Sequence, residues 1–431
     1  MASGPATATR LGYPLMAALL LVMMAGGTLP IPLYVLYEKE MGFGPAGVTV
    51  IFAAYVLGTL FALVTLGGLS DHIGRKPVIA IGIGCAAVST AGFLVASDVW
   101  LLVVARIVSG LAAGFVTGTA TAALAELQPR GDRQAAAIVA TGSNMSGLGL
   151  GTLAAGVFAA YVASPVRTVF WVYLGLCVLA VAALTVIPET VTNPDKVISL
   201  RPALAVPPAI RAVVAGACLG VFAAFSINGF FSSLVPVFLH GILGVRSLAL
   251  VGATSCLVFM TAAVSQAASA RLPGRTSMIA GLPLLLASLA TLETSLFARA
   301  LWLFLVGTVI GGVAVGLTFR GGLSEINRLA EPRHRAAVVS TFFAAAYAGL
   351  GLPSVLTGLI SQITGAVDAS AYTAAVVGVV IAAANIVVIR AFGTRPGGPP
   401  TAPSDSWCCP AEPSGPRVPA EPTTLTPRKD A

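Results

Sequence analysis

The chain has 431 residues, of which 57% are apolar and only 9% carry a charge. A soluble domain carries about 25% charged residues, and the mean hydropathy of +0.94 lies far above the range of such domains. The composition therefore excludes a soluble enzyme, a nucleic-acid-binding protein and a disordered scaffold. The formal net charge of +8 fits a membrane protein, whose cytoplasmic loops are rich in Lys and Arg.

Both ends of the chain are polar. Residues 1–11 precede an apolar run that extends past Tyr37, whereas a cleaved signal peptide has an apolar region of only roughly 7–15 residues. We therefore interpret this run as a first membrane helix. Residues 393–431 contain ten prolines and no apolar run, which predicts a disordered tail. Cys408 and Cys409 have no histidine nearby, which leaves a metal or lipidation role as a minor alternative.

Twelve apolar stretches are long enough to cross a bilayer, which requires roughly 20 apolar residues per helix. They cover about residues 12–36, 45–68, 77–96, 99–125, 135–162, 167–188, 209–239, 246–268, 276–297, 299–322, 335–362 and 371–392. This pattern predicts an all-α polytopic membrane protein with twelve transmembrane helices.

The distribution of charges predicts the orientation of these helices. Of the 24 Lys and Arg residues, Arg106 falls inside a span and four fall on one side. Those four are Lys39, Arg167, Arg246 and Arg299. The other nineteen fall on or near the opposite side, which the positive-inside rule makes cytoplasmic, together with both termini. Three tryptophans mark the outer helix ends, as an aromatic belt would: Trp100, Trp171 and Trp302. We expect a multi-pass protein of the cell membrane.

An internal repeat relates the two halves of the chain. At an offset of 202 positions, Trp100, Gly110 and Gly114 recur as Trp302, Gly312 and Gly316, and residues 147–150 (GLGL) recur as residues 349–352. Two such blocks in one register predict two pseudo-symmetric six-helix bundles with a substrate site between them. The expected organisation is a cytoplasmic N-terminus (1–11), a first bundle (12–188), a cytoplasmic linker (189–208), a second bundle (209–392) and a cytoplasmic tail (393–431).

A charged motif separates the second and third spans. It reads Gly67-Gly68-Leu69-Ser70-Asp71-His72-Ile73-Gly74-Arg75-Lys76-Pro77. This segment resembles the signature loop of the major facilitator superfamily, which implies the fold of that superfamily. Gly74 permits a tight turn, and Asp71 can lie at the positive N-terminus of a helix in the other half. Arg75 can pair with Asp71 and with Glu126, which ends the fourth span.

The resemblance implies that this network latches the two halves in the outward-facing state. The latch residues are Gly67, Gly68, Asp71, Gly74, Arg75, Lys76 and Glu126. The alternative is that the basic residues only set topology. The matching loop of the second half keeps Arg271 and Arg275 but has no aspartate, and we expect Glu325 to pair with one of these arginines as a weaker clamp.

Arg106, followed by Gly110, is similar to the fourth-span motif that proton-coupled members of the family use in proton transfer. A buried arginine costs several kcal/mol unless it is paired or hydrated, so Arg106 is our candidate for proton coupling. A structural hydrogen bond to a neighbouring helix is the alternative. The glycine-rich fifth span, from Gly142 to Gly156, resembles that of the drug and metabolite:proton antiporters, although it lacks their proline.

The position of the acids bears on the cargo. None of the sixteen Asp and Glu residues falls in the middle of a span, whereas exporters of cations often contain a buried carboxylate. Arg106 and Arg320 are the deepest charges, which favours neutral or anionic cargo. Polar candidates for the cavity wall are Tyr55, Asn144, Asn228, Gln266, Arg320 and Tyr347. Each of them has the alternative role of a helix–helix hydrogen bond.

These features together predict a monomeric secondary transporter that exports a drug, antibiotic or other small organic compound in exchange for protons, by alternating access. An uptake symporter for a small neutral or anionic solute is the alternative. A polytopic membrane enzyme would need a catalytic cluster, but the three histidines are scattered singly. We therefore expect no enzymatic activity, no cofactor and no metal.

Overall fold

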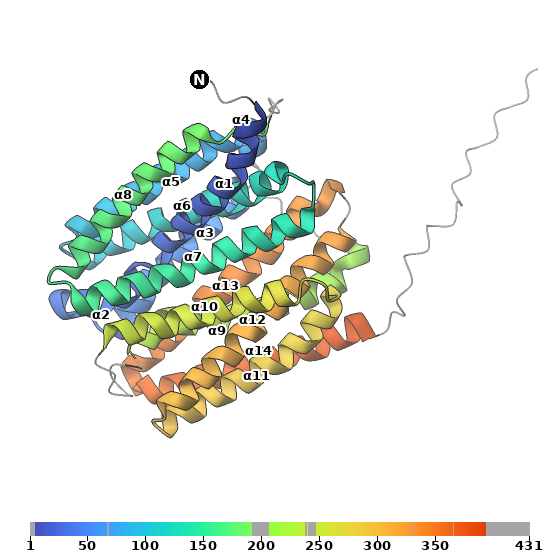
Figure 1. Ribbon diagram of the computed structural model, residues 1–431. Helices are drawn as coiled ribbons and strands as arrows, with labels where there is room; N and C mark the ends of the chain where they lie inside the picture. The colour runs from blue at the N-terminus through green and yellow to red at the C-terminus, as the bar shows by residue number, and fades with distance from the viewer. Residues whose placement is uncertain are drawn as a thin grey trace, which may run out of the picture. The chain divides into compact units, whose positions relative to one another are not determined.

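The computed structural model describes residues 5–66, 69–191, 207–237, 239, 247–330, 332–364 and 366–393, and the regular elements in these ranges are helices (Figure 1). They are α1 (Pro5–Thr28), α2 (Pro30–Met41), α3 (Pro45–Leu66), α4 (Leu69–Ile73), α5 (Arg75–Val95), α6 (Val99–Leu127), α7 (Arg133–Tyr161), α8 (Pro165–Val186), the 3-10 turn η1 (Pro208–Ile210), α9 (Arg211–Val237), α10 (Leu248–Ala268), α11 (Gly274–Phe297), α12 (Leu301–Leu329), α13 (Pro332–Thr364) and α14 (Ala366–Gly393).

In the part of the chain that the structure describes, eleven helices are long and apolar enough to cross a membrane. The prediction of an all-α polytopic membrane protein is confirmed. The first span, Leu11–Met41, contains most of α1 and all of α2. It is interrupted at Leu29 because Pro30 and Pro32 have no N–H to continue the hydrogen bonds of the preceding turn.

The helix α7 is not among the eleven, although its 29 residues would be long enough. Glycine, serine, threonine and asparagine lower its apolar content. The structure explains this composition, because α7 packs against α1 within its own group of helices and against α10 across the molecule. A helix with protein on both sides presents less of its surface to lipid.

The helices form two groups that meet along two seams. Helices α1 to α8 pack mainly on one another, and so do α9 to α14. The seams are α7 against α10 and α3 against α13, and the first of them runs through the middle of Figure 1. The two groups correspond to the predicted bundles, while the exact domain boundaries stay a prediction.

The repeated glycines make equivalent contacts in the two groups. A Cβ on Gly110 of α6 would lie 2.2 Å from the Tyr55 carbonyl oxygen of α3, and one on Gly312 of α12 would lie 2.6 Å from the Val258 carbonyl oxygen of α10. Both glycines therefore let the backbones of neighbouring helices touch. The pseudo-symmetry that the sequence repeat predicts is thus visible in the packing.

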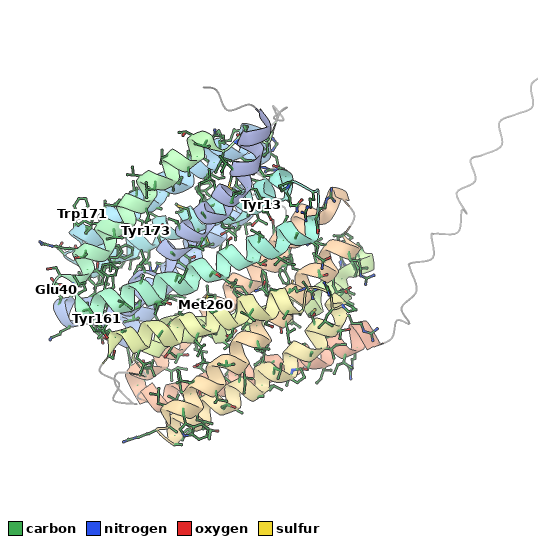
Figure 2. The ribbon with its side chains drawn as sticks, viewed as in Figure 1. Tyr13, Glu40, Tyr161, Trp171, Tyr173 and Met260 are labelled. Carbon is green, nitrogen blue, oxygen red and sulfur yellow. The ribbon has the colours of Figure 1, made fainter. Side chains whose placement is uncertain are left out.

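The two ends of the bundle differ in their side chains. We call "basic end" the end with the loops around Gly74, Gly131 and Arg271, and "far end" the opposite one. Trp100, Trp171 and Trp302 are all exposed near far-end helix termini, as an aromatic belt requires. Figure 2 shows Trp171 with Glu40 and Tyr161 at this end, and Tyr13 toward the other.

Several predicted features lie outside the described residues. These are Gly67 and Gly68 of the loop motif, most of the linker at 189–208, and the tail with Cys408 and Cys409.

Candidate functional site

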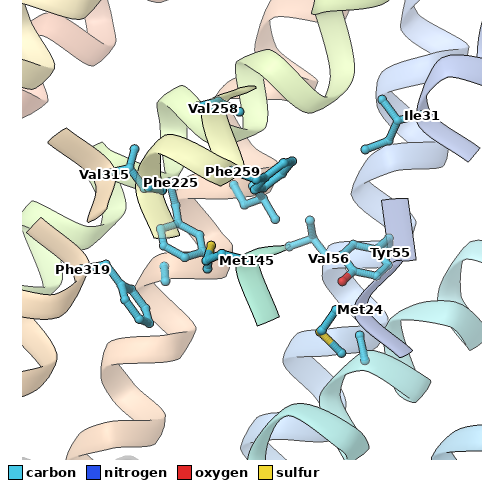
Figure 3. Packing of buried hydrophobic residues seen from close by; sticks show 14 of the residues in the cluster. Met24, Ile31, Tyr55, Val56, Met145, Phe225, Val258, Phe259, Val315 and Phe319 are labelled. Atoms are coloured by element: carbon cyan, nitrogen blue, oxygen red, sulfur yellow. The ribbon is translucent and has the colours of Figure 1, made fainter. Parts of the chain in front are cut away.

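A cavity of about 120 Å³ lies between the two groups of helices. The first group contributes Met24, Gly27, Thr28, Ile31, Phe52, Tyr55, Thr117, Thr121, Ala140, Thr141, Asn144, Met145 and Leu148. The second group contributes Phe225, Asn228, Phe259, Phe319, Leu323, Phe343, Tyr347 and Leu350. Figure 3 shows Tyr55, Met24 and Ile31 on one side of this seam and Phe225, Phe259 and Phe319 on the other.

Four of the six predicted cavity residues line this space: Tyr55, Asn144, Asn228 and Tyr347. Gln266 does not line it, since it lies on α10 about two turns beyond Phe259 toward the basic end. Arg320 does not line it either. Its guanidinium donates to the Ser277 hydroxyl at 2.8 Å and to the carbonyl oxygens of Ala270 and Leu272, so it secures the α10–α11 loop instead.

The cavity wall is mostly apolar and rich in aromatic rings, and its described residues carry no charge. Seven of its lining side chains are aromatic, and none of the described lining residues carries a charge. Aromatic faces bind flat apolar molecules without needing a counter-ion. Sequence reasoning missed Phe225, Phe259, Phe319 and Phe343, because a phenylalanine that faces a cavity has the same pattern as one that faces lipid or core.

Close contacts between the two groups lie on the far-end side of the cavity. A Cβ on Gly252 of α10 would lie 2.5 Å from the Thr152 carbonyl oxygen of α7. In the other seam, a Cβ on Gly358 of α13 would lie 2.0 Å from the Thr49 hydroxyl of α3. At the far end α10 therefore touches the backbone of α7, and α13 touches a side chain of α3. At the basic end, Gln134 of α7 donates to the Ala270 carbonyl oxygen at 2.8 Å, so the cavity lies between contacts at both ends.

Arg106 lies behind the cavity wall and is fully buried. Its Nε donates to the Tyr34 hydroxyl and its Nη1 to the Gly27 carbonyl oxygen at 2.7 Å. Its Cζ lies 5.3 Å from the ring centroids of both Tyr34 and Tyr55, within the range of a cation–π contact. Its Nη2 has no hydrogen-bond partner among the described residues, so the charge is held by aromatic rings and a carbonyl.

A second polar cluster lies in the loop motif at the basic end. Gly74 has a φ of 99°, which confirms the expected tight turn. After this turn, Arg75 pairs with Asp71 at 2.6 Å and with Glu126 at 2.9 Å. Glu126 also accepts a hydrogen bond from the Thr190 hydroxyl. The structure thus brings the predicted partners of Arg75 together.

Glu189, just beyond α8, caps the start of α5. Its carboxylate accepts the backbone N–H groups of Arg75 and Lys76, each at 2.9 Å. Burial alone would raise the pKa of Glu189, but backbone hydrogen bonds from Lys76, Val191, Arg75 and Thr190 outweigh it and lower the pKa. A carboxylate at a helix N-terminus also has a favourable interaction with the helix dipole. Glu189 is not among the residues predicted from the sequence to form this cluster.

The described contacts of this loop cluster all lie within the first group of helices. Asp71 pairs with Arg75, four residues further along the chain, and its side chain is 59% exposed. The Lys76 ammonium lies 3.5 Å from the Thr185 carbonyl oxygen, also in the first group. The predicted latch between the two halves therefore stays a prediction.

In the second half, Glu325 contacts both Arg328 and the backbone of Arg275. Glu325 is buried near the end of α12 and forms its ion pair with Arg328, three residues further on, at 2.6 Å. It also accepts the backbone N–H of Arg275 at 3.0 Å, whereas Arg271 is exposed. Arg328 lies within one helical turn of Glu325, so this ion pair needs no loop to move. The clamp through Arg271 or Arg275 stays a prediction.

Known proteins resemble this chain in sequence. The model of the Major Facilitator Superfamily matches residues 15–298. A triacylglyceride transporter of Mycolicibacterium smegmatis is 32% identical over 133 residues, which are 31% of this chain and 24% of the relative. The quinolone resistance protein NorA of Staphylococcus aureus is 29% identical over 108 residues, which are 25% of this chain and 28% of the relative. The matches thus span about a quarter of the length of these relatives.

A solved structure resembles the whole bundle. The human organic anion transporter MFSD10 (TETRAN) superposes with a TM-score of 0.65 over 90% of this chain and 100% of that one, at 18% sequence identity. At this identity the likeness concerns the fold.

Proposed function

The chain belongs to the Major Facilitator Superfamily, and we propose that within this family of secondary transporters it exports a small uncharged organic compound in exchange for protons. The observation that carries the proposal is the cavity between the two groups, whose described lining residues are aliphatic, aromatic or polar and carry no charge. Alternating access in this fold places the cargo at such a position. Both walls come from one chain, so a monomer suffices.

Two further observations support export and coupling. One partial relative is named for resistance to quinolones, and export of a toxic compound is one way in which a transporter confers resistance. Arg106 is a buried charge next to Gly27 and Tyr55, which line the cavity. A charge at this place senses any proton that enters the neighbouring cavity, which makes it the candidate for coupling. In this proposal the basic end faces the cytoplasm.

The direction of transport is tested in cells that express the protein. We expect accumulation of uncharged aromatic compounds to fall relative to cells without it, and resistance to toxic members of this class to rise. A rise in accumulation of the same compounds would contradict export and favour an uptake symporter.

Coupling is tested in proteoliposomes with the purified protein. We expect an imposed pH gradient to drive a transported compound against its own concentration gradient. Collapse of the pH gradient with a protonophore should abolish this accumulation. Transport that is indifferent to the gradient would contradict proton coupling while leaving the transporter assignment intact.

A further inference from the structure

One polar side chain of the cavity wall, that of Asn228, has an atom without a hydrogen-bond partner among the described residues. Asn228, on α9, is 2% exposed, and its Oδ1 is buried without a hydrogen bond to any described residue. Buried amide oxygens in proteins are nearly always paired. A hydrogen-bond acceptor left unpaired in a binding cavity therefore indicates a donor that arrives with a ligand.

The contacts around Asn228 hold α9 in place without a hydrogen bond to the Asn228 Oδ1. The next residue, Gly229, already packs α9 against α13, since a Cβ there would lie 2.1 Å from the Leu350 carbonyl oxygen. One turn earlier, Phe225 packs edge-on against Tyr347, with ring centroids 6.3 Å apart. The helix is thus fixed by apolar and backbone contacts, and the Asn228 amide is available for recognition.

The other residues of the cavity wall indicate the remaining features of the ligand. Phe225, Phe259 and Tyr347 come from the same side of the seam as Asn228, and Tyr55 comes from the opposite side. Their rings favour a flat apolar body. Since the described wall has no charge to balance an ion, the ligand donor is an uncharged hydroxyl or N–H rather than an ammonium.

We propose that Asn228 is a specificity-determining residue of the cavity, whose Oδ1 accepts a hydrogen bond from the hydroxyl or N–H of an uncharged, flat aromatic cargo. This inference rests on the proposed function and names the class of cargo and the atom that selects it. A cargo without the donor leaves the amide oxygen unpaired and binds more weakly.

The test uses pairs of uncharged probes that differ only in the donor, namely carbazole with N-methylcarbazole and acridone with N-methylacridone. Binding to the purified full chain is followed by probe fluorescence. The wild-type protein should bind the N–H member of each pair about tenfold more tightly, the ratio that one neutral hydrogen bond contributes. Asn228→Leu, which keeps the side-chain size, should reduce this ratio to about one by weakening only the N–H member.

A matched control uses the same substitution outside the cavity. Asn385 of α14 donates to the Ile381 carbonyl oxygen one turn earlier, and Asn385→Leu should keep the tenfold ratio. The melting temperature of the empty protein provides a second readout. Asn228→Leu should leave it unchanged or raise it, because the substitution removes an unpaired buried oxygen.

Three results would overturn the inference. An equal loss of both members of a pair on Asn228→Leu would show that the amide only shapes the cavity. A clear fall in the melting temperature would show a structural hydrogen bond. Failure of the wild-type protein to bind any probe would refute the cargo class, while export and pH-driven transport of other compounds would continue to support the proposed function.

Discussion

Arg106 is a fully buried charge within the first group of helices. Its described contacts are the Tyr34 hydroxyl, the Gly27 carbonyl oxygen and two tyrosine rings. A cation in such apolar surroundings costs several kcal/mol, and the π faces and hydrogen bonds offset part of this cost. A buried charge that costs this much usually has a function. This agrees with the proposed role of Arg106 in proton coupling.

Arg106→Lys tests this role. Lysine keeps the charge but lacks the planar fork that reaches Tyr34 and Gly27 at the same time. We expect pH-driven transport in proteoliposomes to fall by about tenfold or more, since misplaced groups lose most of their effect, while probe binding changes little.

Tyr34→Phe is the matched control, because it removes one hydrogen bond and keeps the ring. It should cost about 1.5–3 kcal/mol of stability, as for a bond to a charged group, and retain more transport than Arg106→Lys. If the Arg106→Lys variant showed the wild-type rate of pH-driven transport, Arg106 would have only a structural role.

Glu189 makes stability depend on pH. Backbone hydrogen bonds lower its pKa below the ordinary value of 4.5 despite its partial burial. A carboxylate with a lowered folded-state pKa stabilises the fold above the unfolded-state pKa, and this contribution is lost as the pH falls through the folded-state pKa. We expect Glu189→Gln to melt at a lower temperature than wild type at neutral pH. The gap should close as the pH falls below about 4.5, and a gap that is constant with pH would contradict the cap.

Among the elements, α7 and α10 form the seam that decides how closely the two groups approach at the far end. Gly156 and Gly252 face each other there, and a Cβ on Gly156 would lie 2.9 Å from the Gly252 Cα. Neither backbone has room for a methyl group. Both the low hydropathy of α7 and its many glycines follow from the position of α7 in a seam between packed helices.

Gly252→Ala should force α7 and α10 apart, since its Cβ would lie 2.5 Å from the Thr152 carbonyl oxygen. We expect a loss of about 1–3 kcal/mol, as for other overpacked sites, and slower transport because the far end closes less well. Gly175→Ala on α8 is the control, because a Cβ there meets nothing within 4 Å. That substitution should raise stability by up to about 1 kcal/mol. Equal melting temperatures of the two variants would contradict the tight seam.

For the whole molecule, the contacts between the two groups differ at the two ends of the bundle. At the far end Gly252 packs against the Thr152 carbonyl oxygen and Gly358 against the Thr49 hydroxyl. At the basic end Gln134 donates to the Ala270 carbonyl oxygen across the groups, while Asp71 is largely exposed and pairs within its own group. Alternating access opens one end as it closes the other. In our proposal, closure of the basic end brings Asp71 to a helix N-terminus of the second group.

Asp71→Asn should therefore slow transport in proteoliposomes while the protein still folds. Its melting temperature should change little, because exposed ion pairs contribute about 0–1 kcal/mol. Asp98→Asn is the matched control at the far end, where Asp98 caps α6 by accepting the Leu101 N–H at 2.9 Å. Asparagine caps a helix about as well as aspartate, so this variant should transport normally. Unchanged turnover in Asp71→Asn would contradict the latch.

The sequence by itself determined the class of protein and its pseudo-symmetry. Apolar stretches of sufficient length predict membrane helices because the bilayer thickness fixes that length, and the repeated glycines and tryptophans reveal two related groups. The partners of Arg75 were also predictable, because Asp71 lies one helical turn away and Glu126 ends a neighbouring span.

Only the tertiary structure decided which side chains face the cavity. Asn228 and Gln266 are both amides in apolar helices, yet only Asn228 lines the cavity, and Arg320 binds loop carbonyls instead. The contacts of Arg106 and the cap formed by Glu189 could likewise not be predicted from the sequence. The physical reason is that a helix in lipid is apolar all around, so its sequence does not record which side faces lipid, a neighbouring helix or the cargo. That choice is made by packing between segments far apart in the chain.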